Sequence, residues 1–256
     1  MRKLISAIYG ITAYLTFLIA FFYAIGFVGN LYVPKSIDSG TETTFLSALI
    51  VNTLLLSIFA IQHSVMARPA FKKWLNGIIN PAIERSTYVL LSSLALFLIY
   101  WKWQPITTVV WNIENETMST ILTSVFFFGW LLALFSTFMI NHFELFGLKQ
   151  ILDNLNDKFS KIEIPNRACE LNEVKFQANF LYKIVRHPIM LGYLIAFWST
   201  PLMTVGHLLF AVITTLYILV AVKYFEEKDL KKSLGNAYED YQNKVPMLVP
   251  FTKNRK

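Results

Sequence analysis

The sequence predicts an all-α integral membrane protein with six transmembrane helices, and its composition and the placement of its charges carry this prediction. Hydrophobic residues make up 55% of the 256 residues and charged residues only 15%, whereas soluble domains carry about 25% charged residues. Five stretches contain no Asp, Glu, Lys or Arg: 4–34, 43–67, 86–101, 117–143 and 187–222. A bilayer crossing takes about 20 apolar residues, so the first four stretches hold one crossing each and the last holds two.

Each expected helix occupies one of these uncharged stretches. We expect helices at about 4–28, 44–66, 86–103, 119–141, 188–203 and 206–225. The last two form a tight hairpin, because Pro201 and Gly206 mark a turn within the final stretch. No internal repeat and no low-complexity tract divides the chain, so residues 1–256 are expected to form a single membrane domain.

Two polar segments are long enough to fold outside the membrane. The connector 142–187 has apolar residues at 145, 148, 151, 152, 155 and 159, a spacing typical of an amphipathic helix that lies in the membrane interface. The tail 226–256 contains Gly235, which ends a short helix, and then Pro246 and Pro250, which force extended backbone. We expect this tail to fold back as a cap over the cytoplasmic mouth of the bundle.

The basic residues set the expected orientation. Of the 23 Lys and Arg residues, two precede the first helix, four lie between the second and third, seven lie between the fourth and fifth, and eight follow Val222. Positive residues collect on the cytoplasmic side, so we expect both termini there, in a multi-pass protein of the bacterial inner membrane. Anionic lipid head groups account for the net charge of +7. The bilayer is therefore the expected partner, with no nucleic acid and no obligate protein partner.

The turn before the fifth helix forms the first half of a candidate site. Pro188 suits the first turn of a helix, and the free N–H groups and dipole at such a start favour an anion. Arg186 and His187 stand immediately before it, and Gly192 is expected to let a ligand approach the backbone one turn later. Cys169 is the only cysteine, so no disulfide and no cysteine-based metal site is expected.

The end of the last helix forms the second half. Glu226 and Glu227 stand there, and a rise of about 1.5 Å per residue brings them to a depth similar to that of Pro188. A zwitterion with ribose hydroxyls and an adenine would find a partner for each group, so S-adenosylmethionine is the expected cofactor. The residues expected to enclose the adenine are Tyr238, Tyr241, Val245 and Pro246. The alternative is that these charged residues only anchor helix ends at the interface.

The C-terminal third resembles the membrane methyltransferases of the isoprenylcysteine carboxyl methyltransferase type. The matching motifs are L-Y-x-x-V-R-H-P-x-x-x-G at 181–192, the E-E pair at 226–227, G-x-x-Y-x-x-Y at 235–241 and V-P-M-L-x-P at 245–250. The resemblance implies that this third binds S-adenosylmethionine. Met190 departs from the pattern, because the superfamily often has Tyr at this position.

Upstream strings are similar to one subgroup, the methanethiol S-methyltransferases. They are Q-H-S-V-M-A-R-P-A-F-K-K-W at 62–74, P-A-I-E-R-S-T-Y-V-L at 81–90, N-H-F-E-L-F-G-L-K-Q at 141–150 and T-V-G-H-L-L-F-A at 204–211. Together with the C-terminal motifs, they extend the similarity over most of the chain. The resemblance implies an enzyme that methylates the small thiol methanethiol to dimethyl sulfide.

Polar residues at the cytoplasmic ends of the second, third and fourth helices form the expected substrate shell, because ionisable groups near a membrane core are functional candidates. The expected substrate-binding residues are Gln62, Arg68, Arg85, Tyr88 and His142. A thiol reacts as its thiolate, and a neutral His63, oriented by Glu84 or Glu144, is the expected general base. His207 lies near the outer turn, so we expect it to pack rather than react.

Two alternatives remain open. The first is another membrane methyltransferase, acting on an isoprenylcysteine carboxylate or a lipid amine. The second is a non-catalytic haem- or ion-handling helical bundle, because some proteins that share the R-H-P core are linked to nitrogen-oxide metabolism. Two histidines that face each other within the bilayer would favour haem.

Overall fold

The computed structural model describes residues 1–156 and 180–252, and these residues are mostly helical. Among them, five helices are long and apolar enough to cross a membrane. They are α1 (Arg2–Gly29), α2 (Phe45–Ala67), α4 (Glu84–Lys102), α5 (Glu116–Ile140) and a last helix built from α10 (Val205–Val220), the π-helical η4 (Ala221–Glu226) and α11 (Glu227–Leu234). The prediction of a mostly helical chain with several membrane-crossing helices is therefore confirmed.

The helix expected at 188–203 is shorter than predicted. α9 (Pro188–Trp198) has 11 residues and rises about 16 Å, too little to cross a hydrocarbon layer of about 30 Å. The chain continues non-helically through 199–204, which can span a further 20 Å or so at about 3.3 Å per residue. This extra length brings the start of α9 level with the end of η4. The described residues thus contain five candidate crossings instead of the expected six.

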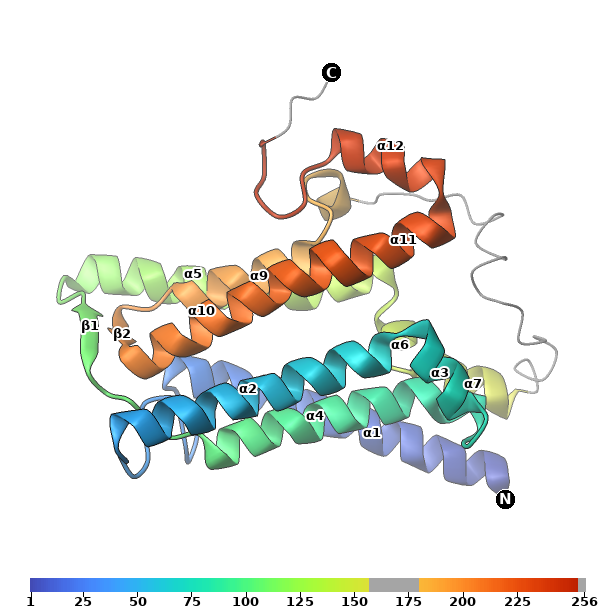
Figure 1. Cartoon of the computed structure of the whole chain (residues 1–256), viewed down its shortest axis with the longest axis horizontal. Coiled ribbons are helices and arrows are strands. Elements are labelled where there is room, and N and C mark those ends of the chain that lie inside the picture. The colour runs from blue at the N-terminus through green and yellow to red at the C-terminus, as the bar shows by residue number, and fades with distance from the viewer. Residues whose placement is uncertain (157–179, 253–256) are drawn as a thin grey trace.

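Two short strands depart from the all-α prediction. β1 (Val109–Asn112) pairs antiparallel with β2 (Leu202–Thr204), with Val109 opposite Thr204 and a bulge within β1. The pair ties the α4–α5 connection to the turn between α9 and α10 at one end of the bundle, which we call the strand end (Figure 1). Proline and threonine next to β2 disfavour a helix there, so the chain crosses this turn as extended backbone.

The contact between α5 and α9 depends on two glycines. A Cβ on Gly192 would lie 2.6 Å from the backbone nitrogen of Ala133 and 2.6 Å from the carbonyl oxygen of Gly129. A Cβ on Gly129 would lie 2.6 Å from the backbone nitrogen of Ala196. Close backbone approach through small residues is typical of helix pairs in membranes. The expectation that Gly192 opens the backbone to a ligand is therefore wrong, because α5 occupies that space.

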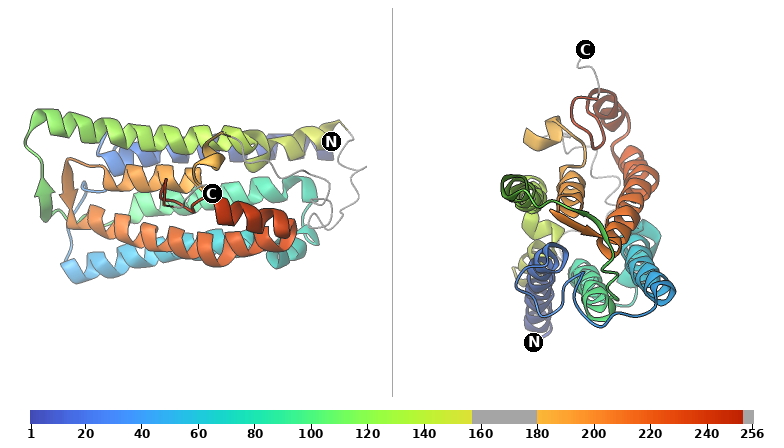
Figure 2. Two further views of the ribbon diagram at one scale, coloured as in Figure 1. Left: turned by 90° about the horizontal axis from the view of Figure 1, so that it is seen from above. Right: turned by 90° about the vertical axis from the view of Figure 1, so that its left-hand side faces the viewer.

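An aromatic core fills the space between the helices, whose arrangement in the bundle is seen end-on in Figure 2. It includes four buried side chains: Phe27 of α1, Tyr100 of α4, Trp103 directly after α4, and Phe210 of α10. Trp103 Nε1 donates to the carbonyl of Ile37 at 3.0 Å, so its polar atom is satisfied. Many large apolar side chains instead face outward on the long helices, as they do where helices contact lipid.

Short helices gather at the opposite end of the bundle, which we call the site end (Figure 1). They are α3 (Pro69–Asn76), η1 (Pro81–Ile83), α6 (His142–Leu145) and α7 (Leu148–Leu155). The short helices η3 (Phe180–Lys183) and α12 (Asn236–Lys244) lie along one side of the bundle, above α9 and α11 in Figure 1. The expected amphipathic helix is split into α6 and α7, and Ile151 of α7 packs against Gly10 of α1. Its last expected apolar position, 159, lies outside the described residues. The cytoplasmic location of the site end stays a prediction.

Candidate active site

The turn before α9 is held by the C-terminal tail. The backbone N–H of Arg186 donates to the carbonyl of Pro246 at 2.9 Å, and that of His187 donates to the carbonyl of Met247 at 3.2 Å. Arg186 Nη1 also donates to the carbonyl of Val245 at 2.6 Å. The tail thus returns to the helix start; its expected role as a cap over the cytoplasmic mouth stays a prediction.

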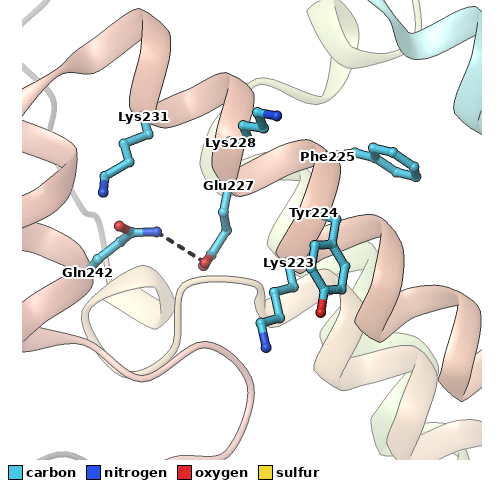
Figure 3. A pocket seen from close by; sticks show the side chains of 7 residues that line it. All are labelled: Lys223, Tyr224, Phe225, Glu227, Lys228, Lys231 and Gln242. Carbon is cyan, nitrogen blue, oxygen red and sulfur yellow. Dashed lines mark hydrogen bonds between the residues drawn. The ribbon is translucent and has the colours of Figure 1, made fainter.

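Glu227 lies at the centre of these contacts, and we call Arg186, His187, Glu227 and the tail residues that bind them the clamp. The Oε1 of Glu227 accepts hydrogen bonds from Arg186 Nε at 2.6 Å and His187 Nε2 at 3.2 Å. Its Oε2 accepts one from Gln242 Nε2 at 3.1 Å, which is drawn in Figure 3. The Arg186 and Glu227 side chains are only 7% and 10% exposed. Both carboxylate oxygens are therefore already bound by the protein. This geometry favours a structural role for Glu227, because its hydrogen bonds join the tail to the start of α9. It does not favour direct contact between Glu227 and a cofactor.

Glu226 is the more open carboxylate. Its side chain is 46% exposed, and its Oε2 lies 3.6 Å from His187 Nδ1. Burial alone lowers the pKa of His187, but the hydrogen bonds and charges of Glu226 and Glu227 outweigh burial and raise it to about 9. His187 is thus a cation at neutral pH, held between two carboxylates. The π-helical η4 ends at this point, and π-segments within helices are frequent at functional sites.

A basic hollow opens beside this clamp. It has a volume of about 530 Å³, and its lining includes Glu227, Gln242 and three lysines, Lys223, Lys228 and Lys231 (Figure 3). Lys231 forms an ion pair with Glu239 at 2.9 Å. The positive lining suits an anionic group of a bound molecule, such as a carboxylate.

The residues expected to enclose an adenine form the core of the cap. Tyr238, Tyr241 and Val245 are buried and pack together with Leu230 of α11. The Tyr241 hydroxyl donates to a backbone carbonyl of η3 at 2.5 Å, and burial raises its pKa to about 12. Their contact with an adenine stays a prediction, and in this structure they serve first to hold the cap together.

The second group of site residues surrounds His63 at the inner face of α2. Tyr88 Oη lies 2.7 Å from His63 Nε2, and Ser92 Oγ lies 3.2 Å from His63 Nδ1. Gln62 Nε2 donates to Ser92 Oγ at 3.3 Å. The imidazole also stacks on the ring of Phe59, with 5.2 Å between ring centroids. The structure thus brings together three predicted residues, Gln62, His63 and Tyr88.

Contacts between α2 and the last helix bring this group next to the clamp. Ser64 Oγ and Tyr217 Oη are 3.1 Å apart, and Arg68 Nη1 forms an ion pair with Asp229 at 2.9 Å. The two halves of the site are therefore joined through the contacts of α2 with the last helix.

The two predicted arginines take different positions. Arg68 is bound to Asp229 and lies over the ring of Phe225, so it links helices. Arg85 donates from Nε to the carbonyl of Leu145 at 2.6 Å, and its guanidinium carbon lies 5.0 Å over the ring of Tyr88. Among the described residues no carboxylate pairs with Arg85. Its positive charge is therefore available to an anion near Tyr88.

Other predicted residues are not part of this group. Glu144 accepts hydrogen bonds from Asn141, which precedes α6, and from Lys149 of α7, and no contact joins it to His63 in the described part of the chain. Glu84 opens α4 without a contact to His63 there, so Tyr88 and Ser92 take the orienting place expected of the two carboxylates.

His142 is a packing residue. Its Nε2 lies 2.8 Å from Tyr14 Oη and its Nδ1 lies 2.8 Å from Thr137 Oγ1, and its ring stacks on Phe138 with 4.1 Å between centroids. Both ring nitrogens are thus bound between α1 and α5, and burial lowers its pKa. The expectation that His142 binds the substrate finds no support in this arrangement.

Histidines do not pair in the described residues. His207 is fully buried at the strand end, where its Nε2 bonds the carbonyl of Phe197 at 3.0 Å, as expected of a packing residue. No three His, Cys, Asp or Glu side chains of residues 1–156 and 180–252 gather as metal ligands. The facing histidines that would favour haem are not found in this part of the chain.

Sequence reasoning missed three features of the site. Ser92 lies four residues after Tyr88 and so shares its helix face, a spacing that could have revealed it. Tyr217 carried no such signal, because it lies in an apolar run and only packing brings it to Ser64. The π-segment η4 also left no mark in the sequence.

Comparisons with known proteins identify relatives of the whole chain. The NnrU family, described as NnrU protein, matches residues 51–247. A protein of Bradyrhizobium diazoefficiens named methanethiol S-methyltransferase 2 is 52% identical over 255 residues, 99% of this chain and 93% of its own length. A Mycobacterium tuberculosis protein named methanethiol S-methyltransferase is 49% identical over 251 residues, 98% of each chain.

A more distant relative shares most of the same region. Nurim of Mus musculus is 28% identical over 197 residues, 74% of this chain and 71% of its own. No solved structure shows a significant match. The resemblance noted in the upstream and C-terminal motifs is confirmed by identities near one half over almost the full length. The chain therefore belongs to the methanethiol S-methyltransferase family, within the wider NnrU family.

Proposed function

We propose that this protein transfers a methyl group from S-adenosylmethionine to methanethiol, giving dimethyl sulfide, at the cytoplasmic face of a bacterial inner membrane. The observation that carries the proposal is that α2, which holds His63 against Tyr88, contacts the same last helix that carries Glu226 and Glu227 of the clamp. Full-length relatives named methanethiol S-methyltransferase support the substrate. The proposed orientation rests on the basic residues at the site end.

The residues of the clamp fit a zwitterionic methyl donor. Glu226, half exposed and beside protonated His187, is placed to accept hydrogen bonds from an ammonium or from ribose hydroxyls. The hollow lined by Lys223, Lys228 and Lys231 suits a carboxylate. When bound, S-adenosylmethionine supplies an electrophilic methyl group on a sulfonium. Arg186 and Glu227 act indirectly, because they fix the helix start and the tail around it.

The surroundings of His63 fit a small thiol. Phe59 and Met66 lie on the same side of α2 as His63, and Met66 is buried. Apolar walls of this kind exclude water, and an electrostatic interaction is stronger where water is excluded. A thiolate that meets a sulfonium there loses its charge in the reaction, so low polarity favours the step. The protein's part is mainly alignment of the two reactants.

The proposed general base is His63, but its hydrogen bonds restrict the path by which a proton can reach it. Both ring nitrogens are bound, Nε2 to Tyr88 and Nδ1 to Ser92. A proton that leaves the thiol for His63 along these bonds passes through the Tyr88 hydroxyl. Tyr88 is therefore proposed as the group nearest the substrate sulfur.

A headspace assay tests the proposal. Membranes that contain the protein should form dimethyl sulfide from methanethiol and S-adenosylmethionine, and the Glu226→Ala variant should need more cofactor for half-maximal rate. Glu239→Ala is the matched control, because Glu239 is a similarly exposed carboxylate of the cap whose ionic partner among the described residues is Lys231. No dimethyl sulfide from the unaltered protein would refute the proposed activity.

The same preparation separates the alternatives. A methylated product from an isoprenylcysteine or a lipid amine, without dimethyl sulfide, would identify another membrane methyltransferase. A Soret band in the purified protein would instead support the haem-handling alternative.

A further inference from the structure

Four side chains form a continuous hydrogen-bonded chain across α2 and α4. Gln62 Nε2 lies 3.3 Å from Ser92 Oγ, Ser92 Oγ lies 3.2 Å from His63 Nδ1, and His63 Nε2 lies 2.7 Å from Tyr88 Oη. Tyr88 Oη is also 3.1 Å from Nδ1, but its shorter contact is to Nε2. The direction of these bonds decides what the chain offers to a substrate.

The amide of Gln62 sets that direction at one end. Its Nε2 also lies 3.1 Å from Met66 Sδ, and a thioether sulfur has no proton, so the amide nitrogen must be the atom that faces it. Turning the amide over would place an oxygen against that sulfur and leave both N–H groups without these acceptors. Gln62 Nε2 therefore donates, and Ser92 Oγ accepts.

The direction of the remaining hydrogen bonds follows from the number of protons that each group can donate. Ser92 has one hydroxyl proton, and within the described residues its only other partner is His63 Nδ1. Ser92 therefore donates to Nδ1, and neutral His63 carries its proton on Nε2 and donates it to Tyr88 Oη. The Tyr88 hydroxyl proton then has no acceptor in the described part of the chain, so the chain ends in a free donor.

The charges around Tyr88 strengthen this donor. Arg85, which lies over the Tyr88 ring, has no carboxylate partner among the described residues. From the other elements, Arg68 is neutralised by Asp229, and Tyr217 and Glu226 face the same group. Glu226 lies beside the His187 cation. Arg85 is thus the uncompensated charge, and it favours an anion near Tyr88 Oη.

We propose that Gln62, Ser92, His63 and Tyr88 form a one-way donor chain that ends on the substrate sulfur and holds methanethiol as its thiolate. This inference rests on the proposed methyl transfer, and it replaces the general-base role of His63 with binding of the thiolate. The thiol loses its proton to bulk water, and the site selects the resulting CH3S⁻. The sulfur lone pair then forms the new C–S bond as the bond from the methyl to the sulfonium breaks, and two neutral sulfides result.

Tyr88 is then a catalytic residue, because it touches the reacting sulfur, and the other three are positioning residues. A general base and a thiolate-binding donor differ in their pH dependence. If His63 removes the proton through Tyr88, the loss in a Tyr88→Phe variant shrinks as pH rises, because more thiolate forms without help. If Tyr88 only donates to the thiolate, the loss is the same at every pH.

The first test measures kcat/KM for methanethiol from pH 7 to 9 in the wild-type protein and in Tyr88→Phe. Removing a hydrogen bond to a charged group should lower kcat/KM by about 10- to 100-fold, by the same factor across the range. Cofactor affinity should stay unchanged. A ratio that falls about tenfold per pH unit toward one would overturn the donor chain in favour of a base.

The second test reverses the chain without removing an atom from it. In Gln62→Glu the new carboxylate only accepts, so Ser92 turns its proton toward it, His63 donates from Nδ1 to Ser92, and Tyr88 must donate to Nε2. The free donor is lost, and kcat/KM should fall about as far as in Tyr88→Phe. Ser93→Ala is the matched control, because Ser93 Oγ donates to the carbonyl of Val89 in its own helix and to no other group in residues 1–156 and 180–252.

These outcomes separate the inference from the proposed function. Wild-type activity in Gln62→Glu, with a normal Ser93→Ala control, would overturn the chain and leave the methyltransferase proposal intact. Absence of dimethyl sulfide from the wild-type protein would instead refute the proposed function. If Tyr88→Phe does not accumulate in the membrane, Ser92→Ala replaces it, and a drop in its kcat/KM that does not vary with pH is the supporting result.

Discussion

Loss of the Glu227 carboxylate should open the C-terminal cap, whereas loss of its neighbour Glu226 should not. Glu227 is 10% exposed and pairs with Arg186, which is 7% exposed. In Glu227→Ala, the guanidinium would stay buried without its partner. Removing one member of a buried ion pair costs about 3–5 kcal/mol, and the lower figure already corresponds to a more than 100-fold larger open population.

Limited proteolysis in detergent measures this population. Lys244 stands at the end of α12, next to the tail residue Val245 that Arg186 binds, so trypsin should cut there only when the cap is open. Where opening and closing are faster than cleavage, the cleavage rate follows the open population. We expect cleavage in Glu227→Ala to be about 100 times faster than in the unaltered protein.

Glu226→Ala is the matched control. Glu226 is 46% exposed, and its ionic contact with His187 is 3.6 Å long, so its loss should cost no more than about 1 kcal/mol. Cleavage after Lys244 should rise by less than about fivefold. Equal cleavage rates in the two variants would show that Glu227 does not hold the cap, and the reasoning from buried hydrogen bonds would fail.

Three further outcomes follow from the fold. The two carboxylates raise the pKa of His187 to about 9 from an ordinary 6.5. The stabilisation that protonated His187 gives the clamp is therefore complete below about pH 6.5 and is lost as pH rises through 9. The melting temperature should fall over this window, and His187→Gln should make it less dependent on pH. Gly192→Ala should force α5 and α9 apart and cost more than about 2 kcal/mol, whereas Gly77→Ala, which meets only one backbone oxygen at 3.3 Å, should cost less than about 1 kcal/mol in the same melting assay. A reporter after Lys256 should be cytoplasmic and one at Asn115 external; the reverse would overturn the proposed orientation.

Long-range charge segregation made much of the fold predictable. The uncharged stretches correspond to α1, α2, α4, α5 and the last helix, because a membrane-crossing helix must exclude charge along its whole length. The fifth stretch failed as a guide to α9, since an apolar segment can be extended as well as helical where a second strand satisfies its backbone. Composition records polarity and does not distinguish these two conformations.

The candidate site divides in the same way. Polar residues at the predicted helix ends were visible, and Gln62, His63 and Tyr88 do meet. Their individual partners were not visible, because hydrogen bonds depend on side-chain direction, which a pattern does not give. Glu227 illustrates the limit: a carboxylate beside a ligand and a carboxylate that holds a tail look the same in a sequence.

The bond between Arg186 and the carbonyl of Val245 has a consequence for biosynthesis. The two residues are 59 positions apart, and at about 5–20 residues per second the ribosome needs about 3–12 s to reach the second after the first. During that time the newly made helix start carries a guanidinium without its tail or its carboxylate. The clamp is thus assembled only after nearly the whole chain has been translated. A nascent or truncated chain that ends before the tail therefore lacks the clamp, even if its helices are already inserted.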